Sequence, residues 1–219
     1  MFRIKICGIK TIKDAEMVSN SGADAVGLNF FPPSIRYLDP TDPDTSAISE
    51  RAAQLSLLRV GVIVNLEITQ AEQLLEQVSL DALQLHGHEA PETAQNWISL
   101  GVPIIKAIKL PTGPISTSVI DQYCLPWIEA GCHPLFDAEA GNAHGGVGAR
   151  VDWESVGKWS KSVPSQNFTL AGGLTPENAA EAIAQTGAQS VDAASGVENP
   201  RGTKNEHSLQ RFVEACHLR

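Results

Sequence analysis

Two short motifs, far apart in the chain, end in side chains that can exchange protons. Lys5-Ile6-Cys7-Gly8 closes a short β-branched run and leaves a cysteine at the end of an expected strand. Leu135-Phe136-Asp137 leaves an aspartate in the same way. A thiolate can accept a proton and a carboxylic acid can donate one. If both strand ends lie on one rim, they form a candidate base and acid.

Glycine-rich turns follow the acidic motif. They stand at Gly145-Gly146, Gly172-Gly173 and Ser195-Gly196. Turns of this kind let backbone N–H groups approach a phosphate closely. An acid, a base and a phosphate-binding turn together indicate isomerisation of a sugar phosphate.

Composition favours a compact soluble enzyme. The chain has 219 residues, 42% of them hydrophobic, which is typical of a folded protein with a substantial core. The net charge of −9 argues against a nucleic-acid surface. We expect no membrane segment and no secretory signal, because no apolar run is long enough and Met1 leads directly into a strand.

Cysteine usage indicates a reducing cytoplasm. The four cysteines are Cys7, Cys124, Cys132 and Cys216, and they form neither a C-x-x-C motif nor a zinc-ligand spacing. We therefore expect no disulfide and no metal site. Apart from Cys7, the cysteines are expected to be packing residues.

Strand-like and helix-like segments alternate along the whole length. The expected strands are Arg3–Cys7, Ala25–Phe30, Leu58–Val64, Ala82–Leu85, Pro103–Lys109, Pro134–Asp137, Phe168–Ala171 and Ser190–Ala193. The expected helices are Ile12–Ser21, Ile68–Val78, Pro91–Leu100, Trp153–Ser160, Pro176–Thr186 and Ser208–Cys216. Gly22 is the expected C-cap of the first helix, and Thr175 is the expected N-cap before Pro176.

This alternation predicts an α/β fold, a (βα)8 TIM barrel that forms a single domain over residues 1–219. A doubly wound sheet is the alternative. It is disfavoured because no G-x-G-x-x-G follows the first strand.

Strand alternation orients the candidate residues. In Arg3–Cys7 the two isoleucines suit the face toward the helices, so Lys5 and Cys7 point into the barrel. Asp137 likewise points inward, opposite Phe136. Strands seven and eight would lie between strands six and one, so a phosphate held there would sit between acid and base.

Several sequence blocks carry a family resemblance. They are Lys5-Ile6-Cys7-Gly8-Ile9, Ser21–Gly27, Phe30–Tyr37, Gly61–Asn65, Leu83–Gly87, Ile105–Ile108, Gly145–Gly148, Val151–Trp153, Leu170–Leu174 and Val191–Glu198. The ordered set closely resembles the phosphoribosylanthranilate isomerase family of tryptophan biosynthesis, nearly end to end.

The resemblance implies an Amadori rearrangement. The substrate would be N-(5-phosphoribosyl)anthranilate and the product 1-(2-carboxyphenylamino)-1-deoxyribulose 5-phosphate. By similarity, Asp137 is the general acid that protonates the ring oxygen, and Cys7 is the general base that removes the proton from C2. No metal or organic cofactor is expected, because the substrate's imine nitrogen is the electron sink.

The resemblance also assigns substrate-binding residues. Arg36 would hold the anthranilate carboxylate, a task that suits guanidinium geometry. The other substrate-binding residues would be Gly146, Gly173, Asp192, Ser195 and Gly196. The expected partner is a phosphorylated small molecule rather than a nucleic acid or a membrane, and the expected assembly is a monomer or homodimer.

Both proton-transfer groups need help from their surroundings. A free cysteine has a pKa near 8.5, so a cation such as Lys5 would be needed to raise its thiolate fraction. An aspartic acid that donates a proton must first hold one, which burial or a nearby phosphate favours.

The chain departs from the family at three positions. Phe31 stands where Tyr is common, Val147 where Ser or Thr is common, and Ala194 where Ser is common. Each change removes a hydroxyl. We expect activity to be retained, because backbone N–H groups can still bind the phosphate.

Other interpretations compete with these. His86, which shares a strand face with Gln84, is expected to be a rim histidine with no proton-transfer role, and Lys106 a structural barrel charge. Another phosphosugar isomerase or epimerase on the same barrel would share the glycine turns. It would not need Cys7, Asp137 and Arg36 together. A non-catalytic barrel that binds a phosphorylated metabolite is the third possibility.

Overall fold

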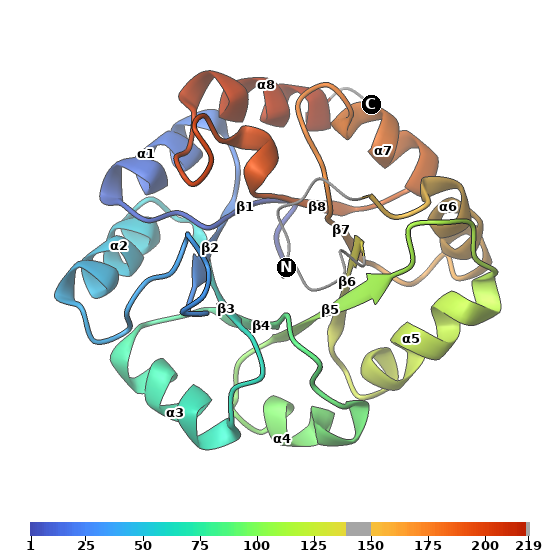
Figure 1. Cartoon of the computed structure of the whole chain (residues 1–219), viewed down its shortest axis with the longest axis horizontal. Coiled ribbons are helices and arrows are strands. Elements are labelled where there is room, and N and C mark those ends of the chain that lie inside the picture. Colours follow the sequence, from blue (N-terminus) through green and yellow to red (C-terminus); the bar gives the residue numbers. More distant parts are fainter. Residues whose placement is uncertain (139–149, 218–219) are drawn as a thin grey trace.

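The computed structural model describes residues 1–138 and 150–217. Within them, eight parallel strands close into a barrel in chain order, and the last strand pairs with the first (Figure 1). The strands are β1 (Ile4–Cys7), β2 (Ala25–Asn29), β3 (Leu58–Ile63), β4 (Ala82–Leu85), β5 (Ile104–Leu110), β6 (His133–Ala138), β7 (Thr169–Leu170) and β8 (Ser190–Ala193).

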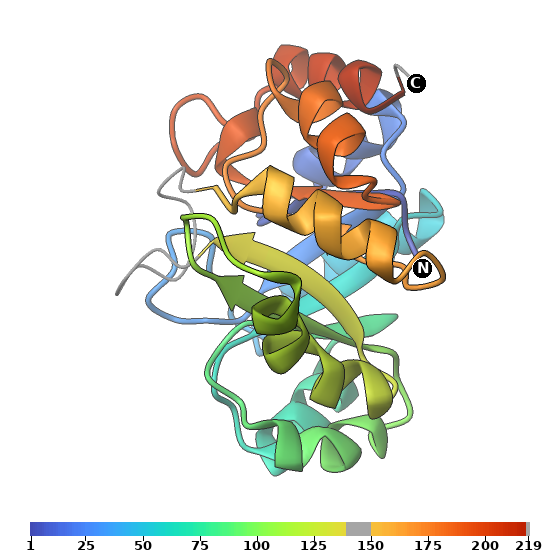
Figure 2. The same ribbon diagram turned by 90° about the vertical axis from the view of Figure 1, so that its right-hand side faces the viewer.

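Helices form a layer around the strand ring. They are α1 (Ile12–Ser21), α2 (Pro43–Gln54), α3 (Ile68–Gln77), α4 (Ala94–Ile98), α5 (Thr117–Glu129), α6 (Trp153–Ser162), α7 (Ala179–Thr186) and α8 (Glu206–His217), with 3-10 turns η1 (Pro91–Thr93) and η2 (Ser195–Val197). A view from the side shows strand arrowheads and the loops that follow them on one rim (Figure 2). The predicted (βα)8 barrel is confirmed.

The helix at the start of the chain follows its sequence signals closely. α1 has the predicted bounds, and Gly22 ends it in the left-handed conformation at φ 87°. Thr11 and Asp14 form a capping box at its start. Because each signal is local, the sequence alone determines this element.

Two helices were not predicted. α2 buries a face of Thr45, Ile48, Ser49 and Ala52, so half of that face is polar and the hydrophobic period is weak. α5 contains Pro126, which disfavours a helix interior. Both helices form because their buried residues pack on the barrel.

The start predicted for α7 is wrong. Pro176 lies in a turn, and the helix begins at Ala179 with Asn178 as N-cap. The Asn178 side chain accepts a hydrogen bond from the Thr175 N–H at 2.8 Å and donates one to the Gly173 carbonyl at 3.0 Å. These contacts tie the residues before α7 to the loop that follows β7.

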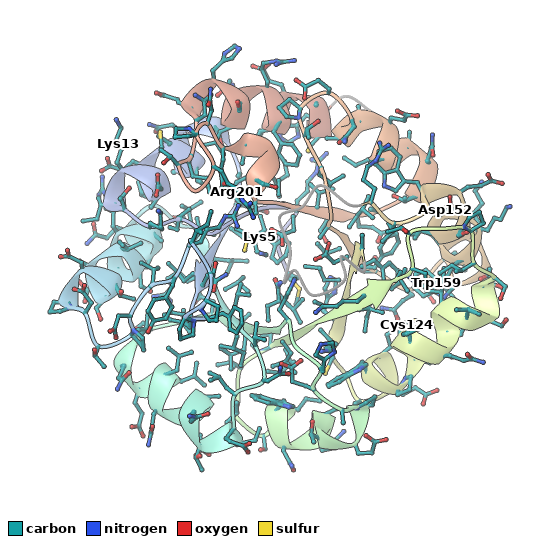
Figure 3. All side chains as sticks on the ribbon, in the orientation of Figure 1. Lys5, Lys13, Cys124, Asp152, Trp159 and Arg201 are labelled. Atoms are coloured by element: carbon teal, nitrogen blue, oxygen red, sulfur yellow. The ribbon has the colours of Figure 1, made fainter. Side chains whose placement is uncertain are left out.

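Side chains alternate across the strands as predicted. Ile4 and Ile6 belong to the core between strands and helices, where Trp159 and Cys124 also lie (Figure 3). Lys5 points into the ring and is fully buried. A smaller apolar cluster fills the barrel interior, formed by Phe2, Ala25, Val60, Ala82, Ile105, Ala107, Leu135 and Ala171. The barrel is therefore packed, and only its rim is open.

Lys106 is a structural charge, as the sequence predicts. Its ammonium donates to the Gly87 carbonyl at 2.9 Å and to the Glu89 carboxylate at 2.5 Å. Glu89 in turn accepts from the N–H groups of Asn65 and Gly87. This buried pair joins β5 to the loop that follows β4.

In the described part of the chain, no helix is long and apolar enough to cross a membrane.

A polar chain crosses the amino-terminal end of the barrel. His133 Nε2 lies 2.9 Å from Thr169 Oγ1, which lies 2.6 Å from Ser190 Oγ. Burial disfavours the imidazolium and lowers the pKa of His133 to about 4. Below the ordinary histidine pKa, the unfolded chain therefore binds a proton that the folded chain excludes. The free energy of unfolding consequently decreases as the pH decreases.

We predict that His133 accounts for part of the acid sensitivity of the fold. The free energy of unfolding should fall as pH drops from about 6.5 to 4, and His133→Gln should reduce that fall by about 2 kcal/mol. Chemical denaturation at pH 7.5 and pH 4.5 measures both. An identical pH dependence in the two proteins would contradict the assignment.

Candidate active site

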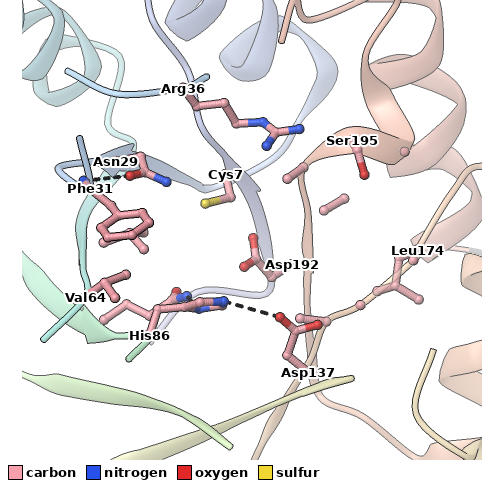
Figure 4. A pocket seen from close by; sticks show the side chains of 18 residues that line it. Cys7, Asn29, Phe31, Arg36, Val64, His86, Asp137, Leu174, Asp192 and Ser195 are labelled. Carbon is pink, nitrogen blue, oxygen red and sulfur yellow. Dashed lines mark hydrogen bonds and ion pairs between the residues drawn. The ribbon is translucent and has the colours of Figure 1, made fainter. Parts of the chain in front are cut away.

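A pocket opens at the carboxyl-terminal rim of the barrel (Figure 4). It holds about 740 Å³ of space, including its mouth. Its lining includes Cys7, Arg36, Asp137, Gly173, Asp192, Ser195 and Gly196. The structure thus brings together every described residue that the sequence predicts for the site. Gly146, like His144 and Val147, lies outside the described residues.

Cys7 ends β1 above a buried ion pair. Lys5 Nζ lies 2.9 Å from Asp192 Oδ2, and the closure of β1 on β8 sets the two residues directly opposite each other. Burial disfavours the Lys5 ammonium, but the charges and hydrogen bonds of Asp192 and Cys7 together outweigh it, so the pKa of Lys5 is raised. The expected cation is therefore present, charged, below the thiol.

The Cys7 thiol is nonetheless a weak acid. Burial raises the pKa of Cys7, and the positive charge of Lys5 offsets this only in part. Asp192, whose Oδ1 has no hydrogen-bond partner among the described residues, opposes ionisation as well. At neutral pH the free site holds mainly the neutral thiol, and the small thiolate fraction is a strong base.

Asp137 is the residue before the last of β6, and its side chain enters the pocket from a different side than that of Cys7 (Figure 4). Its Oδ1 accepts from the Ala138 N–H at 2.9 Å, and its Oδ2 lies 3.3 Å from His86 Nε2. His86 Nδ1 is 3.0 Å from the Gln84 amide. Both carboxyl oxygens are thereby oriented. The strand alternation that turns Asp137 inward also turns Gln84 and His86 inward, but their contact with Asp137 was not predicted.

The turns after β7 and β8 pack backbone against backbone. Gly173 has φ +63°, which favours glycine. A Cβ on Gly196 would lie 1.8 Å from the Leu174 carbonyl oxygen, so only glycine fits there. Among described residues, no hydrogen bond engages the N–H groups of Gly173, Ser195 or Gly196. Three free donors beside the pocket suit an anion.

Arg36 reaches the pocket across Gly8, and two residues that sequence reasoning missed hold it. Glu198 binds the guanidinium through both carboxylate oxygens, and Lys204 binds Glu198. Glu198 is the last residue of the block Val191–Glu198, which carried only the family resemblance, and Lys204 lies in no motif. Arg36 is nearly buried as a result, with 9% of its side chain exposed.

Phe31 and Ala194, two of the three departures from the family pattern, also line the pocket. Within residues 1–138 and 150–217, no three His, Cys, Asp or Glu side chains are grouped so as to hold a metal ion.

The fold and the site define a (βα)8-barrel enzyme whose rim pocket combines ionisable side chains with anion-binding turns. Residues 4–215 match the family model of N-(5′-phosphoribosyl)anthranilate isomerase. The chain is 37% identical to that isomerase from Rhodospirillum rubrum, over 97% of this chain and 96% of the relative.

Solved structures agree with this match. The phosphoribosylanthranilate isomerase of Thermotoga maritima superposes with a TM-score of 0.83 at 34% identity, covering 99% of this chain and 98% of that one. A second isomerase structure, in complex with reduced 1-(o-carboxyphenylamino)-1-deoxyribulose 5-phosphate, has a TM-score of 0.79 at 32% identity, with the same coverage. The chain belongs to the phosphoribosylanthranilate isomerase family, aldose–ketose isomerases of tryptophan biosynthesis.

We predict that iodoacetamide modifies Cys7 before the other cysteines and that its rate still rises at pH 9. Although burial raises the pKa of all four thiols, Cys7 is partly exposed at the pocket, whereas Cys124, Cys132 and Cys216 are buried and out of reach of the reagent. Peptide mass spectrometry after timed labelling measures the order, with Cys7→Ser as the control. A plateau in the Cys7 rate below pH 8 would instead indicate a stabilised thiolate.

Proposed function

We propose that this chain converts N-(5-phosphoribosyl)anthranilate to 1-(2-carboxyphenylamino)-1-deoxyribulose 5-phosphate with Asp137 as general acid and Cys7 as general base. The observation that carries the assignment is that both side chains enter one pocket, from the ends of β6 and β1. Family membership supplies the reaction, and the pocket supplies the two groups that it needs.

Asp137 acts first. Its Oδ1 is held by the Ala138 N–H and its Oδ2 faces His86, so the carboxyl group has a fixed direction toward the bound sugar. In the proposed step, the Asp137 proton passes to the furanose ring oxygen while the C1–O bond breaks. The electron pair of the anthranilate nitrogen forms the C1=N bond, which gives a protonated Schiff base.

Cys7 acts second. The thiolate removes the proton from C2, and the C–H electron pair moves to form the C1=C2 bond as the imine nitrogen takes up the C=N pair. The enolamine then tautomerises to the ketone. Lys5 stabilises the thiolate from below, since it is charged and fully buried beside Cys7.

Two ends of the pocket suit two ends of the substrate. The ligand in the solved isomerase complex, reduced 1-(o-carboxyphenylamino)-1-deoxyribulose 5-phosphate, carries a phosphate at one end and a carboxyphenyl group at the other. In this chain, the free N–H groups of Gly173, Ser195 and Gly196 would hold the phosphate, and the Arg36 guanidinium would hold the carboxylate. The family resemblance also assigns a phosphate contact to Gly146, which lies outside the described residues. Asp192 also lines the pocket, and its carboxylate would accept a hydrogen bond from a sugar hydroxyl.

We propose that residues 1–219 work as one isomerase domain, because β8 hydrogen-bonds to β1 and α8 packs on α1. The four cysteines are free thiols, which favours a reducing cytoplasm. The assembly is proposed to be a monomer or homodimer.

We predict that Cys7→Ser and Asp137→Asn each fold normally and lose about 10²–10⁴-fold in turnover. A serine hydroxyl is too weak a base, and an asparagine has no carboxyl proton to give. The decay of anthranilate fluorescence, with freshly generated substrate and the next pathway enzyme present, measures turnover. Losses below about tenfold in both variants would defeat the assignment.

We predict that Ser195→Asp abolishes stabilisation by inorganic phosphate and by ribulose 5-phosphate, because a carboxylate beside the free N–H groups repels the anion. Ser195→Asn, of equal size and no charge, is the control and should keep the response. The measurement is the ligand-induced rise in melting temperature. A full shift in Ser195→Asp would place the phosphate elsewhere.

A further inference from the structure

Arg36 is fixed by a carboxylate along one edge of its guanidinium. Arg36 Nε donates to Glu198 Oε1 and Nη2 donates to Glu198 Oε2, both at 2.7 Å. A guanidinium has two edges that can bind a carboxylate with paired N–H groups. Glu198 occupies the edge formed by Nε and Nη2, so the end-on edge formed by Nη1 and Nη2 remains for another acceptor.

Glu198 has no capacity left to bind anything else. Its Oε1 accepts from Arg36 and from Lys204 Nζ at 2.8 Å. Its Oε2 accepts from Arg36 and from the Gly202 N–H at 2.8 Å. Although burial opposes its charge, these four donors lower the pKa of Glu198 to about 2, so it stays ionised. With 1% of its side chain exposed, it cannot turn toward the pocket.

Lys204 anchors this cluster to the catalytic strands. Its Nζ also donates to the Cys7 carbonyl at 2.6 Å and to the Ala194 carbonyl at 3.1 Å. Burial lowers the pKa of Lys204, yet three acceptors require all three ammonium protons. The position of Arg36 is therefore tied to the end of β1, which bears the base, and to the turn after β8.

The surface beneath Arg36 is shaped for it. A Cβ on Gly8 would lie 2.2 Å from Arg36 Cδ, so the aliphatic part of Arg36 rests directly on the Gly8 backbone. Gly8 itself has φ +78°, which favours glycine. Arg36, Lys204 and Glu198 together carry one net positive charge, and Arg36 brings it to the pocket wall (Figure 4).

We propose that Glu198, held by Lys204, is a positioning residue that presents the end-on edge of Arg36 to the carboxylate of the substrate's aryl ring. It thereby sets the preference for a 2-carboxyaryl group over an unsubstituted aryl group. This inference rests on the proposed function, in which Arg36 meets the aryl end. Arg36 without Glu198 would keep its charge and lose its direction.

A matched pair of ligands isolates the effect. The first is the product, 1-(2-carboxyphenylamino)-1-deoxyribulose 5-phosphate, and the second is 1-phenylamino-1-deoxyribulose 5-phosphate, which differs only by the missing carboxylate. Calorimetric affinities for the two ligands give a carboxylate preference for each variant. We expect Glu198→Gln to lower that preference by about tenfold or more, the usual size of a charge-assisted contact.

Kinetics give a second readout. In Glu198→Gln we expect KM for phosphoribosylanthranilate to rise about tenfold while kcat changes by less than about threefold, because Cys7 and Asp137 are untouched. Glu16→Gln is the control, since Glu16 also pairs with an arginine, Arg51, but on the exposed surface of α1 and α2. It should leave both quantities unchanged.

Two results would overturn the proposal. One is an equal loss of affinity for both ligands in Glu198→Gln, which would mean that Glu198 only supports the loop. The other is an unchanged carboxylate preference in Arg36→Lys, because a lysine keeps the charge but has no paired N–H edges. If Glu198→Gln does not fold, the result for Arg36→Lys tests the proposal in its place. If Arg36→Met also keeps the preference, the proposed role of Arg36 fails, whereas failure of Glu198→Gln alone leaves that role intact.

Discussion

Closure of the strand ring is the constraint on which the site depends. β1 must pair with β8 in a fixed register, and that register places Lys5 directly opposite Asp192. Because all eight strands are parallel, their carboxyl ends meet on a single rim, and Cys7 and Asp137 reach the same pocket from distant parts of the chain. A one-residue slip between β1 and β8 would turn the inward side chains outward.

The buried charged side chains at this rim are paired with side chains of opposite charge. Lys5 is balanced by Asp192 inside the barrel, and Glu198 is shared by Arg36 and Lys204 at its edge. Leaving one partner of such a pair alone in the interior costs several kcal/mol, so each pair holds its members in place. The Lys5–Asp192 pair places a cation beside Cys7, and the second group leaves one net positive charge facing the pocket.

Local signals determined α1, with its capping box and Gly22, and strand periodicity determined the eight strands and the inward face that carries Lys5 and Cys7. The helices α2 and α5 were not predicted, because the half-polar buried face of α2 weakens its hydrophobic period and Pro126 disfavours the interior of α5. They are stable only against the barrel. For α7 the sequence predicted too early a start, at Pro176. The side-chain hydrogen bonds of Asn178 hold the preceding residues in a turn, and the helix begins only at Ala179.

The sequence by itself determined the family, the fold and the residue types at the rim, because these are written in blocks of neighbouring residues whose order and periodicity are local properties. Tertiary structure decided which groups meet. His86 contacts Asp137, 51 positions later in the chain, and Glu198 binds Arg36 through both carboxylate oxygens across 162 positions. Neither can be read from spacing, because the directions of such side chains are set only when the closed barrel brings separate loops onto one rim.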